Sequence, residues 1–161
     1  MKEQKTIAES RAVLSDVMLP GQANPAGNVH GGEIMKMMDT GASVTAMRHA
    51  KANVVTVRVD ELMFYHPIYV GQLVICESEL VFVGRTSMEV KVTVRVEDML
   101  CDCEVSTALT AFFTFVALDG QGRPCSVPRL RLETDEQRAA FELGRQRHET
   151  HKALRRSAGS R

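Results

Sequence analysis

The sequence contains no tryptophan and has no excess of charge of either sign. Lysine and arginine together number 20, and aspartate and glutamate also number 20. A protein that binds nucleic acid normally presents a basic surface to the phosphates, so this balance predicts no nucleic-acid partner. Without tryptophan, the nine methionines and the aliphatic side chains must fill the interior, and methionine adapts readily to irregular space.

The chain also lacks long apolar runs. No segment approaches the roughly 20 consecutive apolar residues that a membrane-spanning helix needs. The first ten residues are charged and lack the apolar centre of a signal peptide. We therefore expect no membrane insertion and a cytoplasmic location.

Cysteines at the spacing of a metal site are missing too. The four cysteines are Cys76, Cys101, Cys103 and Cys125, whereas zinc sites use ligand pairs at other spacings. We therefore expect no metal. Because the cytoplasm keeps thiols reduced, all four are predicted to be structural thiols, with Cys101 and Cys103 on one face of a strand.

Common catalytic signatures are absent as well. The chain has no Gly-x-Ser-x-Gly elbow of a serine hydrolase, and neither a P-loop nor a dinucleotide-binding Gly-x-Gly-x-x-Gly. One local imbalance of charge remains, because residues 145–161 carry six basic side chains against a single glutamate. This segment is either a solvated tail or a source of phosphate contacts.

What the sequence does contain is a helical pattern followed by alternating ones. From Gly31 to about His49, nearly every position is apolar or small at helical spacing, which predicts a buried helix. Residues 88–96 alternate strictly between apolar and polar side chains, which indicates a strand. Further elements are expected as strands at 54–64, 73–83 and about 103–118, a strand or turn at 14–19, and a helix from 134 to about 152.

Short connections make consecutive strands antiparallel, and one apolar helix lying across such a sheet would bury one of its faces. The sequence therefore predicts an α+β fold in a single domain, residues 1–161, with a core at about 10–135 and a C-terminal helix and tail at about 134–161. Gly41 predicts close packing of the first helix, because glycine is otherwise unfavourable inside helices.

A polar, glycine-rich segment precedes the first helix, and a lone carboxylate lies inside that helix. The segment runs from Asn24 to Gly32, and Asp39 follows about two turns after the helix begins. Open N–H groups at a helix N-terminus attract developing negative charge. A carboxylate in apolar surroundings can act as a general base or a nucleophile. Together these features suit acyl transfer or hydrolysis.

These residues also carry a resemblance to a known family, which extends over about residues 10–135. The matching motifs are Asn24, His30-Gly31-Gly32, Asp39, and the segments 67–74 and 83–90. They resemble the acyl-CoA hydrolases of the hotdog superfamily, a group that includes bacterial enzymes and the mammalian brain and brown-fat enzymes. Gln72 departs from the pattern, since relatives commonly carry aspartate there. The resemblance implies a hotdog fold, in which an antiparallel sheet wraps around one long central helix, and acyl-CoA thioesterase activity.

The resemblance also implies roles for individual residues. Asp39 would be the catalytic carboxylate, acting directly or through water, and Asn24 of the partner subunit would orient water or substrate. The N–H groups of Gly31 and Gly32 would form the oxyanion hole. Relatives form dimers through their sheet edges, and often trimers of dimers, so a homodimer or hexamer is expected.

Coenzyme A would enter as part of the substrate, with no separate cofactor. The residues implied to contact it are Gly84, Arg85, Thr86 and Ser87. Arg129 and Arg131 are weaker phosphate candidates by charge alone. The acyl chain is expected to lie against the helix near Met35 and Met38.

Each assignment has a structural alternative. Asp39 could pair with Lys36 on the same helix, and Asn24 could serve only as a turn residue. His30, a possible catalytic base, could instead cap or pack against the helix. Arg85 could be an ordinary turn residue.

Other functions on the same fold remain open. An aryl-CoA thioesterase shares the His-Gly-Gly and acidic-residue pattern. A dehydratase or hydratase needs a positioned histidine with a carboxylate, for which His30 and Asp39 are the nearby pair. A non-catalytic module that binds acyl-CoA or a nucleotide would not need the carboxylate.

Overall fold

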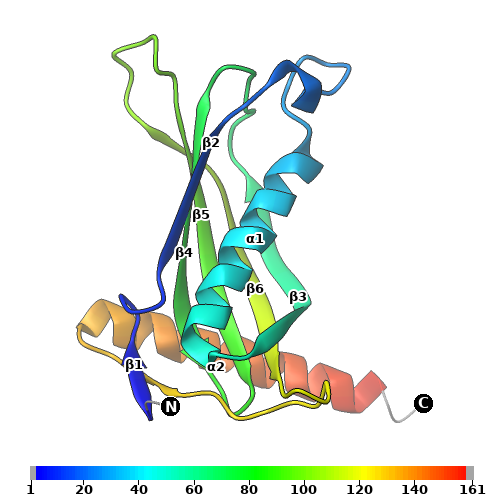
Figure 1. Cartoon of the computed structure of the whole chain (residues 1–161), viewed down its shortest axis with the longest axis vertical. Helices are drawn as coiled ribbons and strands as arrows, with labels where there is room; N and C mark the ends of the chain where they lie inside the picture. Colours follow the sequence, from blue (N-terminus) through cyan, green and yellow to red (C-terminus); the bar gives the residue numbers. More distant parts are fainter. Residues whose placement is uncertain (1–2, 159–161) are drawn as a thin grey trace.

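The computed structural model describes residues 3–158 and shows a long helix held within a curved sheet (Figure 1). Helix α1 spans Gly31–Ala50, and the sheet has the antiparallel strand order β2-β4-β5-β6-β3. The strand bounds are β2 Ala12–Val17, β3 Asn53–Phe64, β4 Leu73–Val83, β5 Ser87–Glu97 and β6 Ser106–Leu118. This arrangement confirms the predicted α+β architecture.

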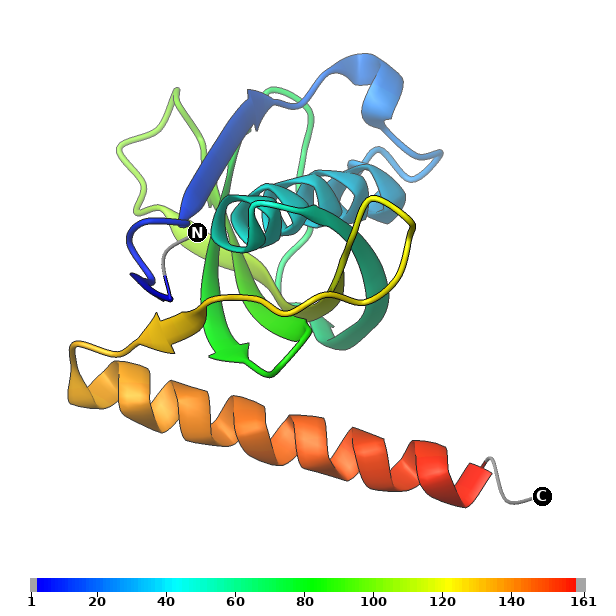
Figure 2. The ribbon, with the colours of Figure 1, turned by 60° about the horizontal axis from the view of Figure 1, so that its bottom comes forward.

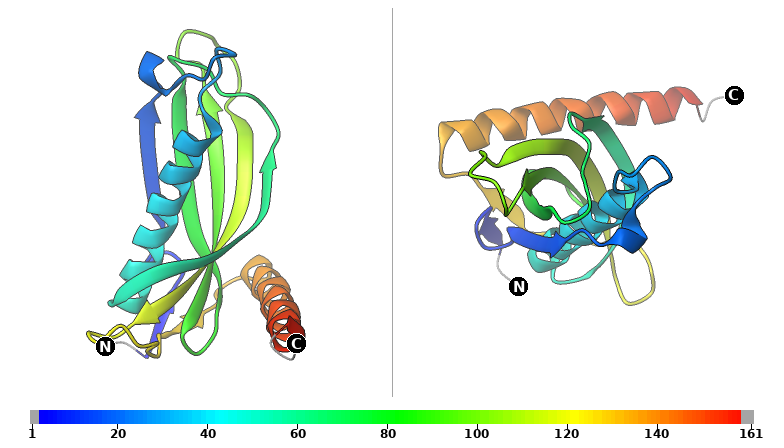
Figure 3. Two further views of the ribbon diagram at one scale, coloured as in Figure 1. Left: turned by 90° about the vertical axis from the view of Figure 1, so that its right-hand side faces the viewer. Right: turned by 90° about the horizontal axis from the view of Figure 1, so that it is seen from above.

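The concave face of the sheet packs against α1, as the views in Figure 3 show. The alternation in β5 places Val90, Val92 and Val94 on this face, where all three are fully buried. Gly41 provides the close approach predicted for it, because a Cβ atom there would lie 3.4 Å from Cys76 Sγ. The prediction that α1 is a buried helix is correct for only part of its surface. The sheet encloses only part of the helix, and Met35 and Met47 on the open side are 39% and 40% exposed.

A second helix packs against the opposite, convex face of the sheet, near the end away from the start of α1 (Figure 1). Helix α2, Asp135–Ala158, crosses this face (Figure 2) and ends later than expected. Thr134 caps the start of this helix, since Gln137 N donates to Thr134 Oγ1 at 3.2 Å. Strands β1, Gln4–Thr6, and β7, Arg129–Arg131, form a separate parallel pair, and Pro20–Gln22 form a 3₁₀ turn, η1. Within residues 3–158, no helix combines the length and apolar character needed to cross a membrane.

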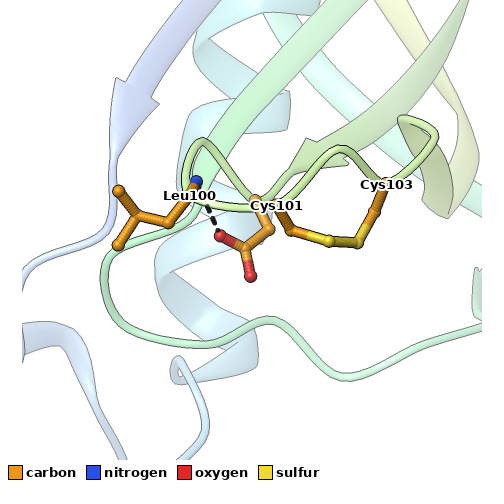
Figure 4. The surroundings of a disulfide bond; sticks show 4 residues. Leu100, Cys101 and Cys103 are labelled. Carbon is orange, nitrogen blue, oxygen red and sulfur yellow. Dashed lines mark hydrogen bonds between the residues drawn. A yellow bond between two sulfur atoms is a disulfide. The ribbon is translucent and has the colours of Figure 1, made fainter.

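The prediction of four free thiols is wrong for two of them. Cys101 and Cys103 form a disulfide in the loop between β5 and β6, and β6 begins only at Ser106 (Figure 4). Asp98 turns the chain before the pair, accepting a bond from Leu100 N at 3.1 Å. The two cysteine Cα atoms lie 5.1 Å apart, which suits a disulfide. Cys76 and Cys125 are free thiols.

Candidate active site

Asp39 lies on the side of α1 that faces strand β3. Thr56 of β3 donates a hydrogen bond from Oγ1 to Asp39 Oδ1 at 2.7 Å. Both residues are half-buried, so the bond holds the carboxylate in one orientation beside the open side of the helix. A carboxylate oxygen can accept further hydrogen bonds, which suits Asp39 to take a proton from water or to attack a carbonyl carbon itself.

Asp39 bonds Thr56 and does not form the alternative pair with Lys36. Lys36 is exposed, and its backbone carbonyl accepts a bond from Thr40 Oγ1 at 2.9 Å. Sequence reasoning missed Thr56, because an isolated threonine in a strand gives no sign of which helix residue it will face. The only available signal was a polar residue at an inward position of a mostly apolar strand.

The side-chain oxygen of Asn24 shapes the loop that precedes α1. Asn24 Oδ1 accepts from Ala26 N at 3.0 Å and from Asn28 N at 3.2 Å. The side-chain oxygen of Asn24 therefore has the alternative role considered above, that of a turn residue. Because the oxygen is engaged within the loop, the group that Asn24 can offer to a substrate or water is the Nδ2 amide donor.

His30 is the N-cap of α1. Its Nδ1 accepts a hydrogen bond from Gly32 N at 3.1 Å, so the capping alternative is confirmed. This contact occupies the Gly32 N–H in this structure, so the expectation that Gly31 and Gly32 both donate to an oxyanion stays a prediction. Among residues 3–158, the Gly31 N–H has no recorded partner, and it is the donor at the helix start that stays open to a ligand.

A cavity of about 210 Å³ joins Asn24 to the start of α1. Its walls include Asn24, Gly31, Phe64 and His66. Asp39 is eight residues further along the helix, which corresponds to about 12 Å along the axis. A single protomer therefore groups Asn24 with the helix N-terminus and keeps Asp39 apart from both.

A stripe of α1 connects the helix start to Asp39. Gly31, Met35 and Asp39 are four residues apart and share one side of the helix. At the two ends of the stripe, Gly31 lies against Phe64 and Asp39 bonds Thr56. Met35 between them is partly exposed, which suits the predicted contact with an acyl chain. Met38 is completely buried in the core, so the same expectation is wrong for Met38 in this structure.

The turn expected to contact coenzyme A lies at the opposite end of the molecule from the start of α1 (Figure 1). It is closed by a bond from Gly84 N to Ser87 O at 2.8 Å, and Thr86 O accepts from Ala117 N at 2.9 Å. Arg85 is exposed, and its carbonyl accepts from Val127 N at 3.0 Å. One protomer does not bring this turn to Asn24, so its role remains a prediction.

The two weaker phosphate candidates lie on β7. Arg129 and Arg131 are exposed, and Arg131 Nη2 pairs with Glu133 Oε1 at 3.3 Å. Their role as phosphate contacts therefore stays a prediction. Within residues 3–158, no cluster of His, Cys, Asp and Glu side chains is arranged to hold a metal ion.

Proteins of similar sequence are named as thioester hydrolases. The family model described as Thioesterase superfamily matches residues 26–103. YkhA of Bacillus subtilis, an uncharacterized acyl-CoA thioester hydrolase, is 37% identical over 155 residues, covering 91% of this chain and 90% of that protein. The cytosolic acyl coenzyme A thioester hydrolase of Rattus norvegicus is 35% identical over 154 residues, covering 95% of this chain and 40% of that protein. This chain thus spans 40% of the length of the mammalian relatives it matches.

Solved structures of similar shape are acyl-CoA hydrolases. The Staphylococcus aureus enzyme, solved with butyryl coenzyme A, coenzyme A and coenzyme A disulfide, has a TM-score of 0.87 at 32% identity over 98% of this chain and 95% of that one. An apo hexameric acyl-CoA thioesterase has a TM-score of 0.88 at 32% identity over 94% of this chain and 97% of that one. Three variants of the S. aureus enzyme, with alanine in place of one asparagine, one aspartate or one threonine, also match.

Proposed function

Because this chain belongs to the acyl-CoA thioester hydrolases of the thioesterase superfamily, we propose that it hydrolyses acyl-coenzyme A to a free acid and coenzyme A. The observation that carries the proposal is Asp39, a half-buried carboxylate held by Thr56 beside the open side of α1. Thioester hydrolysis requires an activated water or an attacking carboxylate, and Asp39 can supply either.

Three groups of this chain would act on the thioester. Asp39 would remove a proton from water or attack the carbonyl carbon. The Gly31 N–H at the start of α1 would stabilise the negative charge that develops on the carbonyl oxygen. The Nδ2 amide of Asn24 would orient the attacking water or the substrate. The replaced asparagine, aspartate and threonine of the S. aureus enzyme have the same order and separations as Asn24, Asp39 and Thr56, which supports these assignments.

Asn24 and Asp39 would meet across an interface between two protomers. Within one protomer they are separated along α1, and β3 beside Asp39 is an edge strand of the sheet. Strand edges normally need a partner or protection, and Val55, Val59 and Phe64 on β3 are exposed apolar side chains. Pairing of two β3 edges would cover these residues and bring the Asn24 loop of one protomer toward Asp39 of the other. The hexameric relative supports a trimer of such dimers.

The substrate would be recognised at the same interface. The acyl chain would lie beside Met35, and coenzyme A would contact the turn formed by Gly84, Arg85, Thr86 and Ser87. No separate cofactor takes part. The relatives named as cytosolic support a cytoplasmic location.

The test measures thiol release from short-chain, long-chain and aryl acyl-CoA substrates. Wild type is compared with Asp39→Asn and with Glu33→Gln, a matched change of an exposed carboxylate on the same helix. We expect Asp39→Asn to lose about 10²-fold or more of the rate, as for a general base, and Glu33→Gln to keep it. A preference for aryl substrates would favour the alternative of an aryl-CoA thioesterase. Wild-type rates in Asp39→Asn would refute the mechanism, and tight binding without thiol release would indicate a binding module.

A further inference from the structure

The loop between β5 and β6 carries a disulfide in an open position. All residues from 98 to 107 are exposed, and Leu100 is 99% exposed. Figure 4 shows the Cys101–Cys103 bond within the loop, next to the turn that Asp98 forms. A thiolate from solution can therefore reach the sulfur atoms without movement of the sheet.

This disulfide is poorly placed to stabilise the fold. A disulfide stabilises mainly by closing a loop of the unfolded chain, and the effect grows with loop length. Only one residue lies between Cys101 and Cys103. The β5–β6 ladder begins outside the loop at the Val96–Ser106 pair, so the strands stay paired when the bond opens. Exposed disulfides are generally the exchangeable ones.

The charge of the loop affects which thiols can approach. Carboxylates flank both cysteines, at Asp98, Asp102 and Glu104, and all three are exposed. The attacking species in exchange is a thiolate, so these charges repel a thiolate that carries further negative groups. Exposed charges act within a Debye length of about 10 Å at 0.1 M salt, which includes a reagent in contact with the loop.

We propose that Cys101–Cys103 is a reversible redox site that exchanges with small thiols, and that its acidic loop favours neutral or cationic thiols over anionic ones. A thiolate attacks one cysteine sulfur, a new S–S bond forms, the Cys101–Cys103 bond breaks, and the electron pair leaves on the other cysteine as a thiolate. A second small thiolate attacks the mixed disulfide and releases a small-molecule disulfide. The result is two reduced cysteines, and two molecules of small thiol are oxidised.

The other two cysteines serve as internal references. Cys76 is fully buried, and burial raises the pKa of its thiol to about 12, so it forms little reactive thiolate near neutral pH. Cys125 is half-buried and free. The site does not depend on the proposed hydrolase activity. If that activity is correct, however, its product coenzyme A bears phosphates and belongs with the disfavoured thiols.

The first experiment follows reversible reduction of the folded protein. Protein prepared without reductant is equilibrated with cysteamine and cystamine at several ratios, acid-quenched and alkylated, and the labelled peptides are identified by mass. We expect Cys101 and Cys103 to gain label together on reduction and to lose it on reoxidation, while Cys76 stays unlabelled. Cys103→Ser should instead retain one cysteamine on Cys101. Full labelling of the pair before reduction, or no opening by millimolar cysteamine, would overturn the proposal.

The second experiment tests the charge selection. Opening rates are compared for cysteamine, glutathione and coenzyme A at equal thiolate concentration in low salt. Cysteamine should be faster by on the order of threefold to tenfold, from Coulomb interactions at high dielectric. The difference should shrink in 1 M salt and in Asp102→Asn/Glu104→Gln, changes at exposed positions that have little effect on folding. Equal rates for the three thiols in low salt would refute the selection by charge.

Discussion

The hydrogen bond from Thr56 to Asp39 connects β3 to the candidate catalytic carboxylate. A hydroxyl in this position fixes the orientation of one carboxylate oxygen. Thr56 is therefore a positioning residue in the proposed reaction. Its contribution is distinct from that proposed for Asp39, which alone would exchange a proton or form a bond.

We predict that Thr56→Val reduces kcat for thiol release by about tenfold, equivalent to about 1.4 kcal/mol, with a smaller change in KM. Thr56→Ser keeps the hydroxyl and should retain most of the rate. An equal loss of kcat in Thr56→Val and Thr56→Ser would assign Thr56 to packing alone.

At the end of α1, His49 couples folding to pH. Its side chain is fully buried, its Nε2 lies 2.8 Å from Pro128 O, and Lys5 Nζ donates to the His49 carbonyl. Burial lowers the pKa of His49, and the Lys5 ammonium lowers it further, against the opposing effect of the Pro128 carbonyl. The folded protein therefore holds this imidazole neutral at pH values where the unfolded chain already protonates it.

The consequence is a loss of stability on acidification. The unfolded chain binds the proton near pH 6.5 and the folded chain only at lower pH, so the free energy of unfolding falls as the pH drops below 6.5. We predict that His49→Gln, which keeps an amide donor toward Pro128 but does not titrate, shows a smaller fall between pH 7.5 and 5.5 in urea unfolding. His148 serves as the reference, because burial also lowers its pKa. The variant His148→Gln should retain the part of the fall in the free energy of unfolding that is due to His49. Parallel curves for wild type and His49→Gln would contradict this assignment.

Helix α2 is held on the sheet by one buried ion pair and by aromatic contacts. Arg147 Nη2 donates to Glu89 Oε1 at 2.6 Å, and Glu89 is only 2% exposed. Arg147 also lies over the Phe112 ring, 3.9 Å from its centroid. Gly144 permits the close approach of the helix, since a Cβ atom there would lie 2.6 Å from Phe82 Cβ.

We predict that Arg147→Leu lowers the free energy of unfolding by about 3–5 kcal/mol, because it leaves the Glu89 carboxylate buried without its partner. Burial already raises the pKa of Glu89, and Arg147 opposes that rise. The double variant Glu89→Gln/Arg147→Leu should recover part of this loss. Urea unfolding of wild type, the two single variants and the double variant forms a double-mutant cycle that measures the interaction energy of the pair. Simple additivity of the two changes would show that the pair does not hold α2.

The long elements were predictable because their local patterns agree with the tertiary fold. The alternation in β5 and the small apolar residues of α1 both match the structure closely. Residues 103–105, the end of the loop between β5 and β6, were predicted as the start of β6, because the turn at Asp98 and the disulfide depend on side-chain contacts that a local pattern does not show. The pairing of Thr56 with Asp39 was not predictable, because it requires the register of β3. The pairing of β3 with β6 shifts in register between Thr56 and Arg58. Beyond this point, the alternation of side chains along β3 predicts the wrong face of the sheet for each residue.

At the scale of the whole molecule, the structure divides the candidate site between two places. The loop with Asn24 and the open Gly31 N–H line one cavity, while Asp39 lies further along α1 with Thr56. The open side of α1 and the edge strand β3 present exposed apolar side chains between these places, including Met35, Val59 and Phe64. A two-fold axis beside β3 would place the loop of each protomer near the carboxylate of the other.

This arrangement can be tested by mixing two inactive proteins. We predict that Asn24→Ala and Asp39→Asn are each nearly inactive as homo-oligomers. After subunit exchange at equal amounts, a dimer of mixed composition contains one site with both native residues. Random pairing in a two-fold dimer then gives about one quarter of the wild-type number of sites, so thiol release should recover to about that fraction. A mixture in which native mass spectrometry confirms exchange but activity does not return would place Asn24 and Asp39 in the same protomer. In that case Asn24 would have to reach Asp39 of its own protomer. Its loop would then have to move along α1 by roughly 12 Å, the distance that separates Gly31 from Asp39 along the helix axis.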